Sequence, residues 1–255
     1  QGYRCASPDP RHMTPSLRKR FHDLHHDLTY VHDARLAKLE VHWRLSEYNH
    51  LIPIVTDLFG ASGQVLTIAG RPIVTLDSEI IFLYLCVHGA FHAWRRLFWL
   101  CDVALFLHNE VDMDWTKLIR FAEQFGATRT VGQGVALAHQ LLHAPLPAPL
   151  QHLIKHDKTL PHLTKEAVHQ MLLPDPHHLS ADRELTNQIR LKIWYETQLY
   201  PGLAHKIAVI KGDGFLRPED WEMIRLPRAL FPLYYLIRPF SWLWRRLILR
   251  EPFQK

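Results

Sequence analysis

The chain has 255 residues, of which 47% are hydrophobic and 22% charged, so its composition supports a folded core and excludes an intrinsically disordered protein. The formal net charge of +5 would suit a polyanionic partner such as a nucleotide or a nucleic acid, although no motif supports nucleic acid specifically. The three cysteines, Cys5, Cys86 and Cys101, give no disulfide framework, which favours a cytoplasmic protein. The longest apolar stretch, residues 80–107, is interrupted by charged side chains, so we expect no membrane span.

The N-terminal part of the chain predicts a β-hairpin. Residues 28–31 have strand character, residues 32–35 are typical of a turn, and residues 36–45 read as a second strand. Side chains of a strand alternate between its two faces, so Glu40 and His42 share one face of the second strand with Arg44, while the other face is apolar. A Glu flanked by apolar residues, with a His two positions further on, is typical of a metal-binding carboxylate. The alternative is that Glu40 has no functional role and is an edge-strand residue that faces solvent.

The rest of the chain is mainly helical by its pattern. Residues 64–76 predict a second hairpin around Gly70, and from Asp77 onward the apolar residues recur as in helices. We therefore expect a first domain at residues 1–50 and a mainly helical domain at residues 51–255, with one hairpin near residues 64–76. The fold class predicted by this layout is α+β.

A polar stripe interrupts the apolar stretch. His88, His92, Arg95, Trp99 and Asp102 follow one another at spacings of three or four residues, so they would line one face of a continuous helix. Polar groups on such a helix are costly unless they are paired, which suggests contact with another polar element. The alternative is a buried network that only fixes the packing.

Other carboxylates give weaker signals. Metal-dependent phosphohydrolases use a His-Asp pair with a further His and Asp on other helices, and this chain has such dipeptides at His26-Asp27, His32-Asp33 and His156-Asp157. We find no Asp-x-Asp pair on a predicted strand. Residues 112–114 have that spacing, but they open a helix, where the helix dipole alone favours acidic residues.

Several segments together resemble a known family, and the most specific of them are LEVHWRL at residues 39–45 and the histidine-bearing helix at residues 83–107. Gly2-Tyr3, Asp114-Trp115 and RLPRALFPLYYLIRP at residues 225–239 also match. The chain resembles the C-terminal two-thirds of the bacterial uncharacterised nucleotidyltransferase family, within the DNA polymerase β-like superfamily.

This resemblance implies a partial nucleotidyltransferase palm of short antiparallel strands, followed by a mostly helical domain. Three carboxylates hold Mg²⁺ or Mn²⁺ in such a palm, and Glu40 would be the third of them. The first two are expected in an Asp-x-Asp strand just upstream of a Gly-Tyr segment, which in this chain is residues 2–3. We therefore expect an N-terminally truncated chain that is inactive without those acids.

The implied function is metal-dependent transfer of a nucleotidyl group from an NTP to an acceptor that the sequence does not identify. Glu40 would bind the metal, and His42 would orient it from the same face. His88, Arg95 and Asp102 are candidates for contacts to the acceptor or the triphosphate. The alternative is a non-catalytic helical binding module derived from the same family. Neither the preferred NTP nor the oligomeric state follows from the residues.

Overall fold

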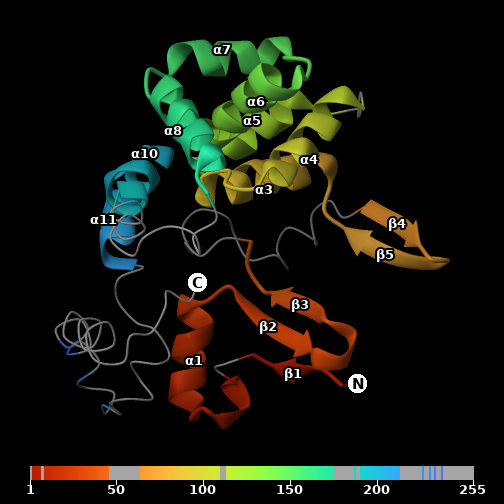
Figure 1. Cartoon of the computed structure of the whole chain (residues 1–255), viewed down its shortest axis with the longest axis vertical. Helices are drawn as coiled ribbons and strands as arrows, with labels where there is room; N and C mark the ends of the chain where they lie inside the picture. Colours follow the sequence, from red (N-terminus) through yellow and green to blue (C-terminus); the bar gives the residue numbers. More distant parts are fainter. Residues whose placement is uncertain are drawn as a thin grey trace. The chain divides into compact units, whose positions relative to one another are not determined.

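The computed structural model describes most of the chain and divides it into two compact units, Gln1–His42 together with Ile207–Lys255, and Trp43–Lys206. The described residues are 2–6, 9–45, 64–109, 113–174, 187, 190–212, 226, 230, 233 and 237. Short antiparallel strands precede a mostly helical region (Figure 1), which confirms the α+β class. Within the described part, no helix combines the length and the apolar character that a membrane crossing requires.

The N-terminal strands form an antiparallel sheet in the order β1-β2-β3 (Figure 1). Its strands are β1 (Arg4–Cys5), β2 (Asp27–His32) and β3 (Ala37–His42). The short 3-10 helix η2 (Asp33–Arg35) joins β2 to β3, and Leu36 follows it in the left-handed conformation with φ of 47°. Such a turn reverses the chain tightly, and it sets the register in which Asp27 lies opposite His42.

Strand β3 is shorter than the predicted strand at residues 36–45. It ends at His42, so Arg44 lies beyond the strand and is buried rather than aligned with Glu40 and His42. The expected apolar face is also less covered than predicted, because Leu39 and Val41 are 50% and 48% exposed. Residues 46–50 of the first predicted domain lie outside the described residues.

A helix that carries the buried side chain of Phe21 precedes β2. The 3-10 helix η1 (Pro10–His12) leads into α1 (Pro15–Leu24). Thr14 caps α1 by accepting a hydrogen bond from the Leu17 amide, and Pro15 occupies the first turn, where its missing N–H costs nothing. Phe21 is buried and stacks on His25, with 4.3 Å between the ring centroids.

The second unit begins with a hairpin made of β4 (Gln64–Ile68) and β5 (Arg71–Thr75). Ala69 and Gly70 both have positive φ values, 51° and 74°, as a type I′ turn requires. Glycine adopts this conformation without steric cost, which explains Gly70 at the tip.

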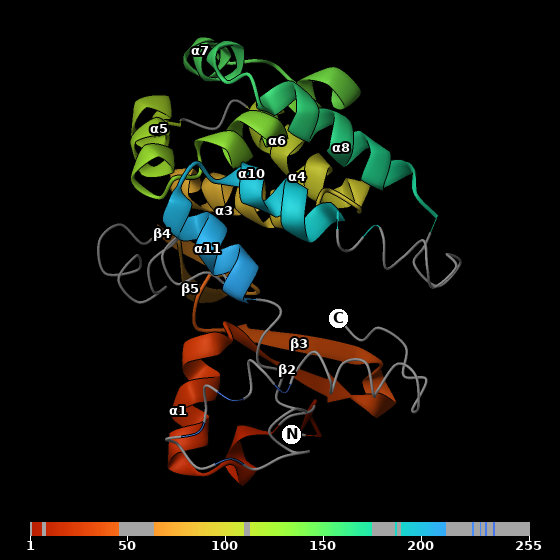
Figure 2. The same ribbon diagram turned by 90° about the vertical axis from the view of Figure 1, so that its left-hand side faces the viewer.

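The remaining described elements are helical, and α6 is the centre of the group from α3 to α8. They are α3 (Ser78–Phe91), α4 (Leu97–His108), α5 (Trp115–Gln124), α6 (Thr128–Leu142), α7 (Ala148–His156), α8 (Leu160–Leu172), η4 (Leu191–Glu196), α10 (Thr197–Leu199) and α11 (Leu203–Gly212). Helix α6 packs against α3, α4, α5, α7 and α8 (Figure 2). Its central residues are buried without interruption, which accounts for its small side chains. The terminal match at residues 225–239 lies mostly outside the described residues.

The predicted continuous helix through the polar stripe is wrong, because α3 and α4 are separated by a turn. Ala93 and Trp94 have φ values of 50° and 55°, which no α-helix accommodates. The Trp94 ring folds back onto α3 so closely that a Cβ on Gly89 would lie 2.3 Å from it. Burial of the Trp94 side chain offsets the cost of this backbone conformation.

Hydrogen bonds in the helical core converge on Gln133 of α6. Its Oε1 accepts from the indole N–H of Trp94 at 3.1 Å and from the hydroxyl of Tyr195 at 2.9 Å. Its amide nitrogen donates to the carbonyl of Leu163 at 2.7 Å. The side chains of Trp94, Gln133 and Tyr195 are buried, and these hydrogen bonds give their polar groups partners inside the core. The network therefore connects the α3–α4 turn, α6, α8 and η4.

Candidate metal centre

The β2–β3 hairpin places Asp27, Glu40 and His42 on one face of the sheet. Asp27 pairs directly with His42 across the two strands, and Glu40 pairs with Thr29. Directly opposite residues of an antiparallel pair point to the same side, and residues two apart share that side. One potential ligand atom from each of the three side chains lies within 4.8 Å of the other two. Among the described residues, this is where carboxylate and imidazole groups converge as metal ligands would.

Two polar side chains lie next to the Glu40 carboxylate. Lys38 Nζ lies 2.5 Å from Glu40 Oε1, and His42 Nε2 lies 3.8 Å from Glu40 Oε2. The Lys38 ammonium beside Glu40 holds the pKa of that carboxyl below its ordinary value. The carboxylate is therefore ionised at neutral pH and can act as a ligand. The Glu40 and Lys38 side chains are 44% and 61% exposed, so the lysine can move away without rearranging the core.

Asp27 and His42 are more enclosed than Glu40. Their side chains are 26% and 27% exposed. The Nδ1 atom of His42 is buried and has no hydrogen-bond partner in the described part of the chain. His26 completes the surroundings, with its Nδ1 atom 3.7 Å from Asp27 Oδ1 and its ring centroid 5.2 Å from that of His42.

The donor set fits a divalent metal ion. Two carboxylates neutralise its charge, and an imidazole with an orphaned buried nitrogen offers a further ligand. Metal–ligand bonds of about 2.1 Å place neighbouring ligands of one ion about 3.0 to 3.4 Å apart. The three side chains would have to close in by up to about 1.8 Å from their 4.8 Å limit, which partly exposed side chains can do by changing rotamer.

Asp27 is the member of this cluster that sequence reasoning missed. The His26-Asp27 dipeptide suggested a phosphohydrolase, in which such a pair lies on helices, but here it lies at the start of β2. The signal that could have revealed Asp27 is the hairpin register, because a turn over residues 33–36 puts position 27 opposite position 42.

Three further acidic residues considered from the sequence, Asp33, Asp114 and Asp157, have structural partners. Asp33 pairs with Arg4 through a hydrogen bond of 2.9 Å, and Asp157 pairs with Arg129 at 2.6 Å. Asp114 caps α5 by accepting from the Lys117 amide at 2.9 Å. Asp112 lies outside the described residues.

The predicted substrate-binding residues lie in the helical unit. His88 is on α3, Arg95 is in the turn that follows, and Asp102 is on α4, all three half-buried. The turn folds α4 back so that His88 and His92 both meet Trp99, with ring centroids 5.2 Å and 4.9 Å away. The stripe is thus a cluster of rings around a turn and not one face of a helix. The substrate-binding role of His88, Arg95 and Asp102 stays a prediction.

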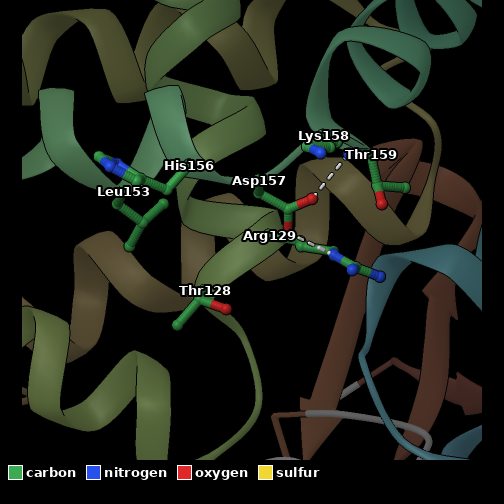
Figure 3. Close-up of a pocket in the computed structure, with 7 residues that line it drawn as sticks. All are labelled: Thr128, Arg129, Leu153, His156, Asp157, Lys158 and Thr159. Carbon is green, nitrogen blue, oxygen red and sulfur yellow. Dashed lines mark hydrogen bonds and ion pairs between the residues drawn. The ribbon is translucent and has the colours of Figure 1, made fainter.

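A pocket of about 450 Å³ lies at the start of α6, beside the loop between α7 and α8 (Figure 3). It is lined by Thr128, Arg129, Leu153, His156, Asp157, Lys158 and Thr159. Arg129 points at Asp157 (Figure 3) and also donates to the carbonyl of Gln198 at 2.7 Å. Asp157 accepts in addition from the Thr159 amide at 2.8 Å. The Arg129 and Asp157 side chains of the wall therefore mainly hold the chain together.

Comparison with known proteins identifies the family. The model of a family described as uncharacterised nucleotidyltransferase matches residues 1–143, which include the candidate metal centre, the β4–β5 hairpin and helices α3 to α6. No curated protein and no solved structure matches the chain. Because the family model covers more than half of the chain, the protein belongs to the uncharacterised nucleotidyltransferase family.

Proposed function

We propose that the protein transfers a nucleotidyl group from an NTP to an acceptor in a reaction that needs a divalent metal, with Glu40 as a metal ligand. The observation that carries this proposal is the convergence of Asp27, Glu40 and His42 on one face of a hairpin, within a chain that belongs to a nucleotidyltransferase family. Nucleotidyl transfer needs positive charge at the phosphates, and such a cluster is where that charge would be held.

The residues of the hairpin have separate tasks in this reaction. Glu40 supplies an ionised carboxylate, because Lys38 keeps its pKa low. His42 Nε2 lies 3.8 Å from the other oxygen of Glu40, and its task in this proposal is to orient that carboxylate. When bound, the metal would stabilise charge on the α-phosphate during in-line attack by the acceptor. The ammonium of Lys38, which lies 2.5 Å from Glu40 Oε1, would add a positive charge beside the metal.

The family resemblance expects a pair of aspartates in addition to Glu40, which would complete a two-metal arrangement. His88, Arg95 and Asp102 remain our candidates for contacts to the acceptor or the triphosphate. All three are half-buried around the α3–α4 turn, so part of each side chain is open to a ligand.

The test uses the full-length gene product and measures pyrophosphate release from each common NTP with Mg²⁺ or Mn²⁺. We expect Glu40→Gln to reduce metal-dependent release at least about 100-fold, because a metal ligand supplies several kcal/mol of charge stabilisation. Asp33→Asn is the matched control, since Asp33 is a carboxylate of the same hairpin that pairs with Arg4 instead. Unchanged release by Glu40→Gln would refute the role of Glu40.

The second candidate function is a helical binding module without catalysis. The pocket at the start of α6 favours it, because Lys158 and His156 in its wall would suit an anionic ligand. Calorimetry separates the two functions. Heat from NTP binding that appears only with a divalent metal, and that disappears in Glu40→Gln, supports the transferase. Metal-independent binding that persists in Glu40→Gln supports the binding module.

A further inference from the structure

The candidate metal centre mixes oxygen and nitrogen donors. Asp27 and Glu40 offer carboxylate oxygens, whereas His42 offers an imidazole nitrogen. Mg²⁺ takes oxygen ligands almost exclusively and keeps several waters, while imidazole suits the first-row transition metals. We propose that this centre binds a divalent transition metal, such as Mn²⁺, in preference to Mg²⁺, with Asp27 and His42 as ligands beside Glu40.

The strand register supports His42 as a direct ligand. Because Asp27 and His42 are paired across the strands, their side chains leave the sheet side by side on the face that also carries Glu40. His42 has a buried Nδ1 atom without a hydrogen-bond partner in the described part of the chain. A buried polar atom without a partner costs free energy. A metal bound through this nitrogen would remove that cost.

Asp27 completes the set from the other strand. One of its carboxylate oxygens lies within 4.8 Å of a ligand atom of His42 and of a ligand atom of Glu40. His26, with Nδ1 3.7 Å from Asp27 Oδ1, stands beside this carboxylate, as residues that orient metal ligands commonly do. The hairpin alone therefore supplies three ligands of mixed type, and water can fill the remaining positions of the metal.

Lys38 provides an internal competitor for the metal. Its ammonium lies 2.5 Å from Glu40 Oε1, so a cation that binds Glu40 must displace it or use the other oxygen. Because this ion pair is largely exposed, the competition is weak, and its removal should strengthen metal binding modestly.

This inference deepens the proposed function, because it names the metal of the same site, but it can be tested without any transfer reaction. Electron paramagnetic resonance of Mn²⁺ measures binding directly, since the signal of the hydrated ion falls as the ion binds. We expect one bound Mn²⁺ that a tenfold excess of Mg²⁺ does not displace, and electron spin echo modulation from one imidazole nitrogen.

Four variants sharpen this experiment. His42→Gln should remove the nitrogen modulation and weaken Mn²⁺ binding at least about tenfold, and Asp27→Asn should weaken it to a similar degree. The matched controls, His12→Gln and Asp33→Asn, should change neither, because both residues are exposed and lie outside the cluster.

A fifth variant should bind the metal more tightly, a result that loss of folding cannot produce. Lys38→Met should strengthen Mn²⁺ binding about two- to fivefold, since it removes an exposed competitor. Circular dichroism and thermal melting establish that each variant is folded before binding is compared.

The outcomes for this inference and for the proposed function differ. Displacement of Mn²⁺ by equal Mg²⁺, absent nitrogen modulation, or normal binding by Asp27→Asn would each overturn the inference, even if nucleotidyl transfer is observed. Nitrogen-ligated Mn²⁺ without any pyrophosphate release would uphold the metal centre and refute the transferase.

Discussion

The polar side chains of the helical core and those of the β2–β3 face lie in opposite environments. Gln133, Trp94 and Tyr195 are buried and saturate one another with hydrogen bonds, and burial raises the pKa of Tyr195 far above its ordinary value. Asp27, Glu40 and His42 are partly exposed, so a ligand can reach their oxygen and nitrogen donor atoms. The first set is expected to stabilise the fold, and the second set is expected to bind.

The largest effect on stability should come from Trp94. We expect Trp94→Ala to lower the free energy of unfolding by about 3 to 5 kcal/mol, because it opens a cavity and leaves Gln133 with one donor fewer. Urea denaturation followed by far-ultraviolet circular dichroism measures the change. Gly89→Ala offers a matched comparison. It should be strongly destabilising alone, where its Cβ would lie 2.3 Å from the Trp94 ring, and much less so in the Trp94→Ala background. Equal costs in both backgrounds would contradict this packing.

Asp157 should have the next effect, and its effect should depend on pH. Burial alone would raise the pKa of Asp157, but hydrogen bonds from Arg129 and the Thr159 amide lower it below the ordinary 3.8. A depressed pKa means that the stabilisation is complete above the unfolded value and is lost as the pH falls through the folded one. Asp157→Asn should therefore lower the free energy of unfolding by about 1.5 kcal/mol at neutral pH. The difference in this free energy between the variant and the unmutated protein should become smaller below about pH 4. If the difference in the free energy of unfolding between the two proteins grew in acid, the lowered pKa of Asp157 would be contradicted.

Tyr195→Phe tests how saturated the buried network is. We expect a cost of about 1 kcal/mol, because the lost hydroxyl leaves Gln133 Oε1 still accepting from Trp94. Thermal melting monitored by circular dichroism is sufficient to detect it. Gln133→Leu removes the shared partner of three groups and should cost clearly more, so similar costs for the two variants would argue against a network centred on Gln133.

The smallest effect on stability should come from a substitution on the β2–β3 face. It directly tests the contrast between this face and the helical core. Glu40→Gln should change the free energy of unfolding by no more than about 0.5 kcal/mol, since its partner Lys38 is largely exposed. Urea denaturation measures this change in protein freed of metal by chelation. A large loss of stability would assign Glu40 a structural role and weaken the contrast between the two regions.

The sequence could predict the hairpin and the shared face of Glu40 and His42, because strand alternation depends only on local order. Asp27 could not be found in the same way, since its place in the cluster depends on a pairing across the turn. The break between α3 and α4 was also hidden. Ala93 and Trp94 are ordinary helical residues in sequence, and they take positive φ only because the Trp94 ring packs into the space beside Gly89.

The turn between β2 and β3 has a consequence for how this hairpin can evolve. Residues 33–36 contribute no ligand, yet they determine that Asp27 faces His42. If a single inserted residue slid β3 along β2 by one position, Leu39 and Val41 would replace Glu40 and His42 on that face. Mutations that exchange side chains in this turn would then be nearly silent, whereas a one-residue change in its length would abolish the site. Natural variation here should therefore preserve length while composition drifts.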